Sequence, residues 1–100
     1  MESGVKMKDT EELIKDLKLK DSSVRRHAIE MLGIMGDEKA VDALVLVLKD
    51  KNRFVRQEAI AALGKIGGER VVEPLTQALG DEKDEFVQNS MRRVLEKLRK

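Results

Sequence analysis

Few side chains in this chain could act as a nucleophile or transfer a proton at neutral pH. It has one histidine, His27, and neither cysteine nor tyrosine. Ser22, Ser23 and Ser90 are candidate nucleophiles, but a serine needs a general base, and none of the three has a histidine at a recognisable spacing. We therefore expect no enzymatic activity and no cofactor. Ser22 or Ser23 is better interpreted as the N-cap of a helix that begins at Val24.

Two segments with paired glycines could be mistaken for loops that bind phosphate: Gly33-Ile34-Met35-Gly36 and Gly64-Lys65-Ile66-Gly67-Gly68. A phosphate loop follows a strand and opens a helix, whereas each of these segments follows a predicted helix. We expect Gly33 and Gly64 to allow close packing between helices. Gly36 and Gly67 are expected to end helices in the left-handed conformation.

These residues are positioned by a repeat of 31 residues. When residues 24–50 are paired with residues 55–81, 12 of the 27 positions are identical and no gap is needed. A fixed period of about 20–50 residues is typical of repeat architectures, in which each unit buries its apolar face against its neighbours. Such a stack offers an extended surface rather than a deep pocket, so the sequence predicts a binding scaffold.

Apolar residues within each unit recur at helical spacing, at Val24, Ala28 and Leu32 in a first helix and at Val41 and Leu44 in a second. We predict an all-α fold, an α-solenoid built as a superhelix of helix pairs, with five to six helices. The expected divisions are a disordered N-terminus at 1–7 and a single repeat domain at 8–100. Within that domain we expect a half-repeat at 8–20, repeats at 21–50 and 51–81, and a capping helix at 82–100.

The segment from Asp21 to Leu44, and the stretches 62–67 (Ala-Leu-Gly-Lys-Ile-Gly) and 72–75 (Val-Glu-Pro-Leu) of the next copy, resemble short HEAT-like repeats of the phycobilisome-lyase type. The resemblance covers roughly residues 8 to 98. It implies a non-enzymatic scaffold for a protein or peptide partner. The alternative that it implies is an accessory subunit of a modifying enzyme, as in bilin lyases.

The resemblance also extends to deoxyhypusine hydroxylase, which binds two irons through His-Glu pairs early in several first helices. The corresponding dipeptides here are His27-Ala28, Glu58-Ala59 and Asn89-Ser90, so this chain has no His-Glu pair. A di-iron site needs several imidazole and carboxylate ligands that converge. We therefore expect no metal site, and interpret His27 as a residue at the surface or flank of its helix.

In solenoids of this kind the second helices line the inner curve, and we expect the partner to bind there. Basic residues recur at Lys8, Lys39 and Arg70, and acidic residues three positions later at Glu11, Asp42 and Glu73. We expect each unit to form its own ion pair between these columns. A charge-striped groove that binds a partner segment is the alternative. The predicted partner-binding residues all lie on this face: Lys39, Asp42, Leu46, Lys49, Arg70, Glu73 and Gln77.

Arg25 and Arg56 recur in register near the start of the first helices. They could form a row of anion-binding sites. We favour a structural ladder, in which Asp50 at the end of one helix contacts Arg56 near the start of the next. The half-units leave apolar helix flanks without a neighbour, so we expect either a homo-oligomer through these end helices or a partner packed on them.

Composition excludes several other classes of partner. The net charge is +1, so no overall field favours nucleic acid or an anionic membrane. No apolar run approaches the roughly 20 residues of a membrane helix, and the N-terminus lacks a signal-peptide pattern. The basic stretch from Met91 to Lys100 follows an acidic cluster and has no aromatic residue to stack on bases, which favours a solvated capping helix. We expect a cytoplasmic protein that binds neither membrane nor nucleic acid.

Overall fold

The computed structural model describes residues 7–100, so the disorder predicted at residues 1–7 falls outside the described residues except at Met7. This part of the chain is helical and contains no strand, which confirms the predicted all-α fold and its upper count of six helices. The elements are α1 (Thr10–Asp16), α2 (Ser22–Met35), the 3-10 turn η1 (Glu38–Ala40), α3 (Val41–Val47), α4 (Arg53–Ile66), α5 (Glu69–Asp81) and α6 (Glu85–Leu98).

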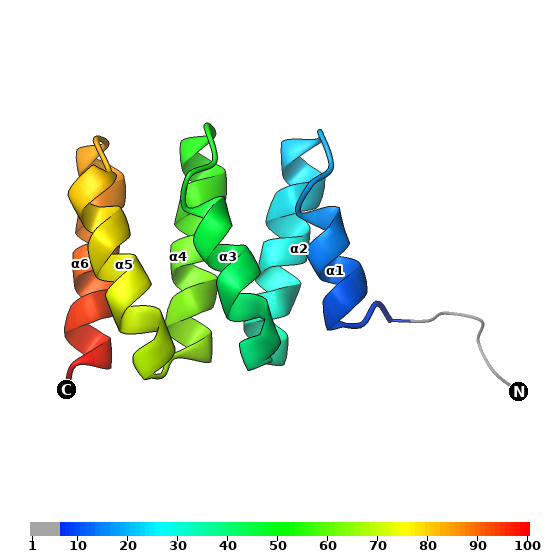
Figure 1. Cartoon of the computed structure of the whole chain (residues 1–100). Helices are drawn as coiled ribbons and strands as arrows, with labels where there is room; N and C mark the ends of the chain where they lie inside the picture. The colour runs from blue at the N-terminus through cyan, green and yellow to red at the C-terminus, as the bar shows by residue number, and fades with distance from the viewer. Residues whose placement is uncertain (1–6) are drawn as a thin grey trace, which may run out of the picture.

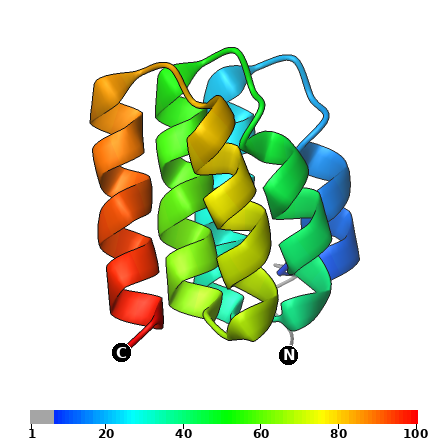
Figure 2. The same ribbon diagram turned by 60° about the vertical axis from the view of Figure 1, so that its left-hand side comes forward.

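The helices form two layers that run the length of the stack. Figure 1 shows α1, α3 and α5 in one layer and α2, α4 and α6 in the other. The turned view in Figure 2 shows the same two layers from nearer the C-terminal end. Within the second layer α2 packs on α4 and α4 packs on α6, while α3 and α5 each pack across onto the other layer. The arrangement is the predicted α-solenoid.

Asparagine and aspartate side chains begin the helices of the second layer. The Asp21 carboxylate accepts a hydrogen bond from the Ser23 backbone N–H at 2.8 Å. Asn52 caps α4 and Asp84 caps α6 in the same way. The prediction that Ser22 or Ser23 caps the first of these helices is wrong, because the helix begins one turn earlier, at Ser22. The Ser23 hydroxyl instead donates to the Asp21 carboxylate at 2.6 Å.

The glycines have the two roles that the repeat predicts. Gly36 and Gly67 end α2 and α4 with φ of 66° and 68°, a backbone conformation that other residues rarely adopt. Gly33 lies where α2 touches α4, and a Cβ added there would be 2.9 Å from the Ala62 Cα. Gly64 faces α6 in the same way, with the nearest side-chain atom 3.2 Å away. The expectations for all four glycines are confirmed.

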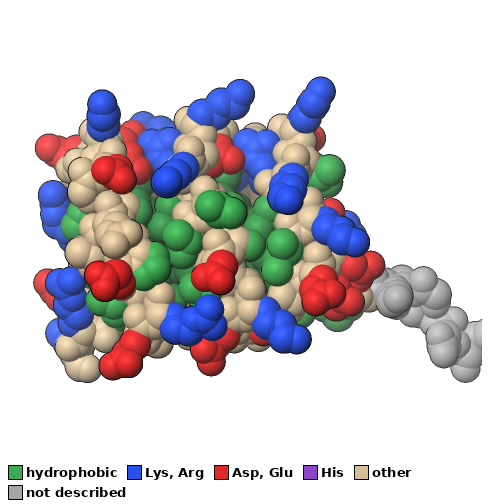
Figure 3. Space-filling model, in the orientation of Figure 1, with side chains coloured by type: hydrophobic (Ala, Val, Ile, Leu, Met, Phe, Trp, Pro, Cys, Tyr) green, Lys and Arg blue, Asp and Glu red, His purple; other side chains and the backbone are tan. Residues whose placement is uncertain are grey.

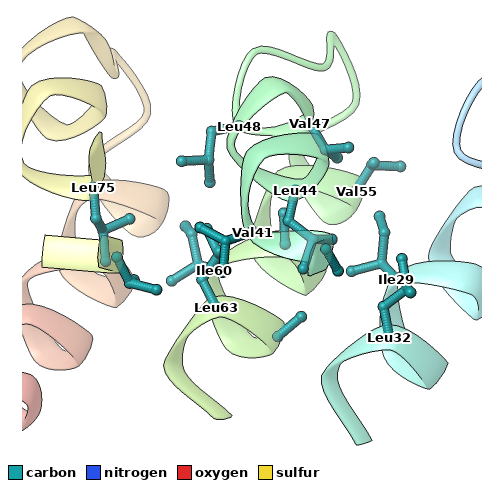
Figure 4. Close-up of a cluster of buried hydrophobic side chains, with 14 of the residues drawn as sticks. Ile29, Leu32, Val41, Leu44, Val47, Leu48, Val55, Ile60, Leu63 and Leu75 are labelled. Carbon is teal, nitrogen blue, oxygen red and sulfur yellow. The ribbon is translucent and has the colours of Figure 1, made fainter. Parts of the chain in front are cut away.

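The core is a continuous apolar sheet of side chains between the two layers. Leu44 and Leu75 from the front layer meet Ile29, Ile60 and Leu63 from the back layer, and all five are fully buried (Figure 4). Because each pair of helices contributes to the same interior as its neighbours, no pair buries its apolar face alone. Both grooves described below lie on the outer surface of the front layer.

Candidate functional site

The outer surface of α1, α3 and α5 carries apolar side chains in its middle and charged ones around them. Figure 3 shows basic side chains along the upper edge, where the loops that follow these helices lie. Acidic and then basic side chains follow below the apolar zone. The face therefore offers both apolar contacts and charges of both signs.

A groove of ≈ 500 Å³ separates α3 from α5. Val45 and Leu48 form its apolar wall on α3, and Pro74 and Ala78 form the wall on α5. Its polar lining comes from the ends of the two helices and the loops that follow them: Lys49, Asp50, Lys51, Arg56, Gln77, Asp81, Glu82 and Lys83. The groove thus combines an apolar interior with a mostly basic rim.

A second groove, of ≈ 230 Å³, lies between α1 and α3. Its lining repeats that of the first groove at an interval of 31 residues. Ile14, Leu17, Lys18, Ala43, Leu46 and Val47 correspond to Val45, Leu48, Lys49, Pro74, Gln77 and Ala78. The two grooves are therefore the same feature in successive repeats.

Half-buried ion pairs close the ends of the repeats beside the grooves. Arg25 Nε lies 3.1 Å from the Asp50 carboxylate, and Arg56 Nε lies 2.9 Å from the Glu82 carboxylate. Each guanidinium also donates to a backbone carbonyl of the loop before its helix, as Arg56 does to Asp50 at 2.7 Å. In the third unit the Gln88 amide donates to the Glu82 carbonyl at 2.6 Å. A neutral side chain thus takes over the last step of the series.

The arginines therefore form the predicted structural ladder, but in a different register. The Asp50 carboxylate pairs with Arg25 of its own unit, while Arg56 reaches only the Asp50 carbonyl. The reason is geometric: α2 and α3 are antiparallel neighbours, so the start of α2 lies beside the end of α3. These arginines are held by carboxylates and carbonyls, which leaves no row of anion-binding sites.

The family model for HEAT repeats matches residues 10–96. The chain belongs to the HEAT-repeat family. No curated protein matches it. Membership fits the two layers, since in such repeats each helical hairpin stacks on the next. The phycobilisome-lyase subtype stays a prediction. Across residues 7–100, no helix of this HEAT-repeat chain is long and apolar enough to cross a membrane.

The residues predicted to bind a partner separate into two groups on the HEAT-repeat surface. Leu46, Lys49 and Gln77 line the grooves. Lys39, Asp42, Arg70 and Glu73 are exposed on the same layer but line neither groove. Leu46 is 71% exposed, which makes it the most accessible apolar side chain of this face. The grooves bring together only the first group.

The predicted ion pair within each unit is wrong. Asp42 lies 3.7 Å from Arg70 of the next unit, so this contact joins α3 to α5 instead of two positions on one helix. Lys39 lies in the 3-10 turn η1, where the spacing of an α-helix does not apply. Lys8 precedes α1 and pairs with Asp16 at 2.6 Å. Because the Asp42 and Arg70 side chains are 90% and 56% exposed, their contact adds little stability.

Sequence reasoning missed the lysines that recur along the loop edge of the face. Lys18 and Lys49 occupy one repeat position, and Lys20, Lys51 and Lys83 occupy another. Three of them line the larger groove. The 31-residue step that identified the other columns would have identified these as well. They place positive charge along the groove rim, where it is available to a partner's carboxylates.

The carboxylates whose pKa is shifted are structural. The Lys39 backbone N–H and the Thr10 hydroxyl, 2.8 Å away, both donate to Asp37 and lower its pKa. The Ser23 hydroxyl and backbone N–H lower the pKa of Asp21. Each carboxylate caps a helix or turn. Within residues 7–100, no group of three or more histidine, cysteine, aspartate or glutamate side chains is placed to hold a metal ion.

The two ends of the stack differ in polarity. At the N-terminal end an apolar hollow of ≈ 470 Å³ includes Leu13, Val24, His27 and Met31. Val24 is 36% exposed there, whereas its repeat equivalent Val55 is fully buried by the neighbouring pair. At the C-terminal end Arg92, Glu96 and Arg99 stand at the repeat positions of Ile60, Gly64 and Gly67. Apolar flanks were expected at both ends, and the structure places the larger one at the N-terminal end.

Proposed function

We propose that this HEAT-repeat chain is a non-enzymatic scaffold that binds a protein or peptide segment along the face of its second helices. HEAT repeats in general mediate protein–protein interaction. The observation that supports this particular face is the repetition of one groove in successive units. A partner segment laid across α1, α3 and α5 would meet the same kind of apolar wall and lysine rim twice.

The two grooves supply different parts of the interaction. Apolar contacts with Val45, Leu48 and Leu46 would contribute most of the affinity, because burial of apolar area is the main favourable term in association. Lys49 and Lys51 on the rim would orient the partner and raise its association rate. Asp42 and Glu73 lie beyond the grooves and would meet a partner that extends across the face.

Charge reversal tests the face. Asp42→Lys with Glu73→Lys changes two exposed acids, and the matched control Glu30→Lys with Glu96→Lys makes the same charge change away from the grooves. A stoichiometric partner purified with the tagged wild-type chain from its source cells is expected to bind the first variant at least ten-fold more weakly and the control as well as wild type. Equal affinity for both variants would contradict the proposed face.

We also propose that any homo-oligomer forms through the N-terminal flank. Val24 and Met31 present apolar surface there, while charged residues stand at the other end. An interface that uses one flank of both copies is closed by a two-fold axis and stops at a dimer. Sedimentation velocity over a range of concentrations is expected to show a monomer–dimer equilibrium that Val24→Lys abolishes. Higher oligomers, or a dimer that survives this substitution, would contradict the proposal.

A further inference from the structure

The two aromatic residues of the chain lie near one another on the layer opposite the grooves. Phe54 begins α4 and Phe86 begins α6, and each ring is 54% exposed. They occupy the same repeat position, one residue before the buried valines Val55 and Val87. A single exposed apolar side chain is common, but both aromatics of a chain at one position of adjacent repeats form a patch. Aromatic residues and arginine are enriched at protein interfaces.

Arginines hold these rings in place. The Arg26 and Arg53 guanidinium carbons lie 5.9 Å and 5.8 Å from the centre of the Phe54 ring. Arg53 also lies 5.3 Å from the centre of the Phe86 ring, and its guanidinium pairs with Asp84 at 3.0 Å. Rings that are fixed before binding lose little conformational entropy when a partner covers them.

A groove of ≈ 610 Å³ extends from these rings between α4 and α6. Ile60, Ala61 and Val94 provide more apolar surface along it. Its charged lining is mainly basic, with Arg26, Arg93 and Lys97 against the single acid Glu58. The flanking helices have 14 residues each, so the groove runs for up to roughly 20 Å at 1.5 Å per residue.

We propose that this second groove, defined by Phe54, Phe86 and the basic residues between α4 and α6, binds an amphipathic helix with an acidic polar face. The apolar side of such a helix would cover the two rings, and its acids would meet Arg93 and Lys97. A helix that lies in a groove of this length contacts it through positions i, i+3, i+4 and i+7. Guanidinium groups already lie over the rings, which disfavours base stacking and hence single-stranded nucleic acid. The proposal does not depend on the grooves of the other layer.

The chain itself supplies a matched substitution. The first repeat has Ser23 at the position of Phe54 and Phe86, so Phe54→Ser with Phe86→Ser uses a residue that this repeat position accepts. Ile34→Ser with Leu46→Ser is the control, because these two apolar side chains are also exposed but do not line this groove. Far-UV circular dichroism establishes that both variants remain helical.

The probe is a display library of random 16-residue peptides selected on the immobilised wild-type chain. Selected peptides are expected to be rich in aspartate and glutamate, with apolar residues at helical spacing. Their affinity is expected to fall at least ten-fold for the phenylalanine variant, and less than two-fold for the control. A second variant, Arg93→Glu with Lys97→Glu, keeps both rings and is expected to lose binding to a similar extent.

Three results would overturn the proposal. They are the failure to select any peptide, peptides without an acidic excess, and peptides that bind the phenylalanine variant as well as wild type. A 15-nucleotide oligo-dT measured in parallel separates the other class of ligand. Binding of the oligonucleotide that depends on Phe54 and Phe86 would assign the groove to single-stranded nucleic acid instead.

Discussion

Replacement of Gly33 by alanine tests how closely the helix pairs stack. The added Cβ would lie 2.9 Å from the Ala62 Cα and 3.0 Å from the Ala62 Cβ. The first of these contacts is with backbone, which cannot rotate away, so α2 and α4 would have to separate. Gly64 is a milder case, because a Cβ there would meet the Val94 methyl groups at 3.2 Å and 3.3 Å. Gly80 is the control, since nothing lies within 4 Å of its added Cβ.

The expected magnitude is the difference between two terms. Alanine in place of glycine inside a helix stabilises by about 0.5–1 kcal/mol, and this is the upper value expected at Gly80, near the end of α5. An extra methyl group in a packed interface costs about 1–3 kcal/mol. Gly33→Ala should therefore lower the free energy of unfolding by about 1–2 kcal/mol. For a domain of this size that corresponds to a fall in Tm of roughly 4–8 °C per kcal/mol.

Unfolding in urea is best followed by far-UV circular dichroism, because the chain has no tryptophan or tyrosine. The expected order of stability is Gly80→Ala first, then wild type and Gly64→Ala close together, then Gly33→Ala. If Gly33→Ala proved as stable as Gly80→Ala, α2 and α4 would not be in the close contact described, and the account of the stack would fail.

Two further predictions concern charge. Arg56→Met leaves the Glu82 carboxylate, only 5% exposed, without its partner and should cost about 2–4 kcal/mol, whereas loss of the 45% exposed Arg53 should cost about 1 kcal/mol or less; equal losses in urea unfolding would refute the distinction. The second uses Asp21→Asn with Asp84→Asn, which keeps the caps, as Asn52 does naturally. Ser23 donors lower the folded-state pKa of Asp21; partial burial raises that of Asp84, but the Val87 N–H and Arg53 lower it on balance. Their charged forms therefore stabilise the fold above the unfolded value of 3.8, and this contribution is lost as the pH falls through the lower folded-state pKa. The stability advantage of wild type over the variant should shrink below about pH 4, and an advantage that is constant between pH 7 and pH 2 would count against these contacts.

The repeat predicted the fold because stacking depends on positions that the sequence shows directly. Leu32 with Leu63, and Gly33 with Gly64, are identical pairs in the alignment and are buried or close-packed in the structure. Helical periodicity then gave six helices, and the turn glycines gave their ends. Identity at a fixed interval is a strong signal for packing, since each unit must present the same surface to its neighbours.

Partner choice among the charged residues could not be predicted in the same way. Asp81 aligns with Asp50 in the 31-residue repeat, but the link before α6 is one residue longer. Glu82 therefore takes the place of Asp50 and receives Arg56. Likewise, which of two acids an exposed Arg70 approaches depends on the distance between α3 and α5, which a linear pattern does not contain.

The grooves themselves could not be predicted because they depend on the same helix spacing. Their linings are repeated, but the alignment alone gives no reason to place Ile14 and Ala43 on opposite walls. Phe54 and Phe86 were missed for another reason. The interval between them is 32 residues, and the analysis of charge columns followed the second helices only. The signal was an aromatic residue immediately before a repeated valine.

The positions that differ between repeats carry the specificity of the proposed interaction. The two grooves present Leu46 and Gln77 at the same place, and Ala43 and Pro74 at another. A bound segment that shifted by one repeat would exchange an apolar contact for a polar one, and an unsatisfied polar group at an interface is costly. Identical grooves would let a segment bind in either of two registers. Unlike grooves on an identical scaffold fix one register and one direction, so stacking needs the repeat to be regular and recognition needs it to be broken at these positions.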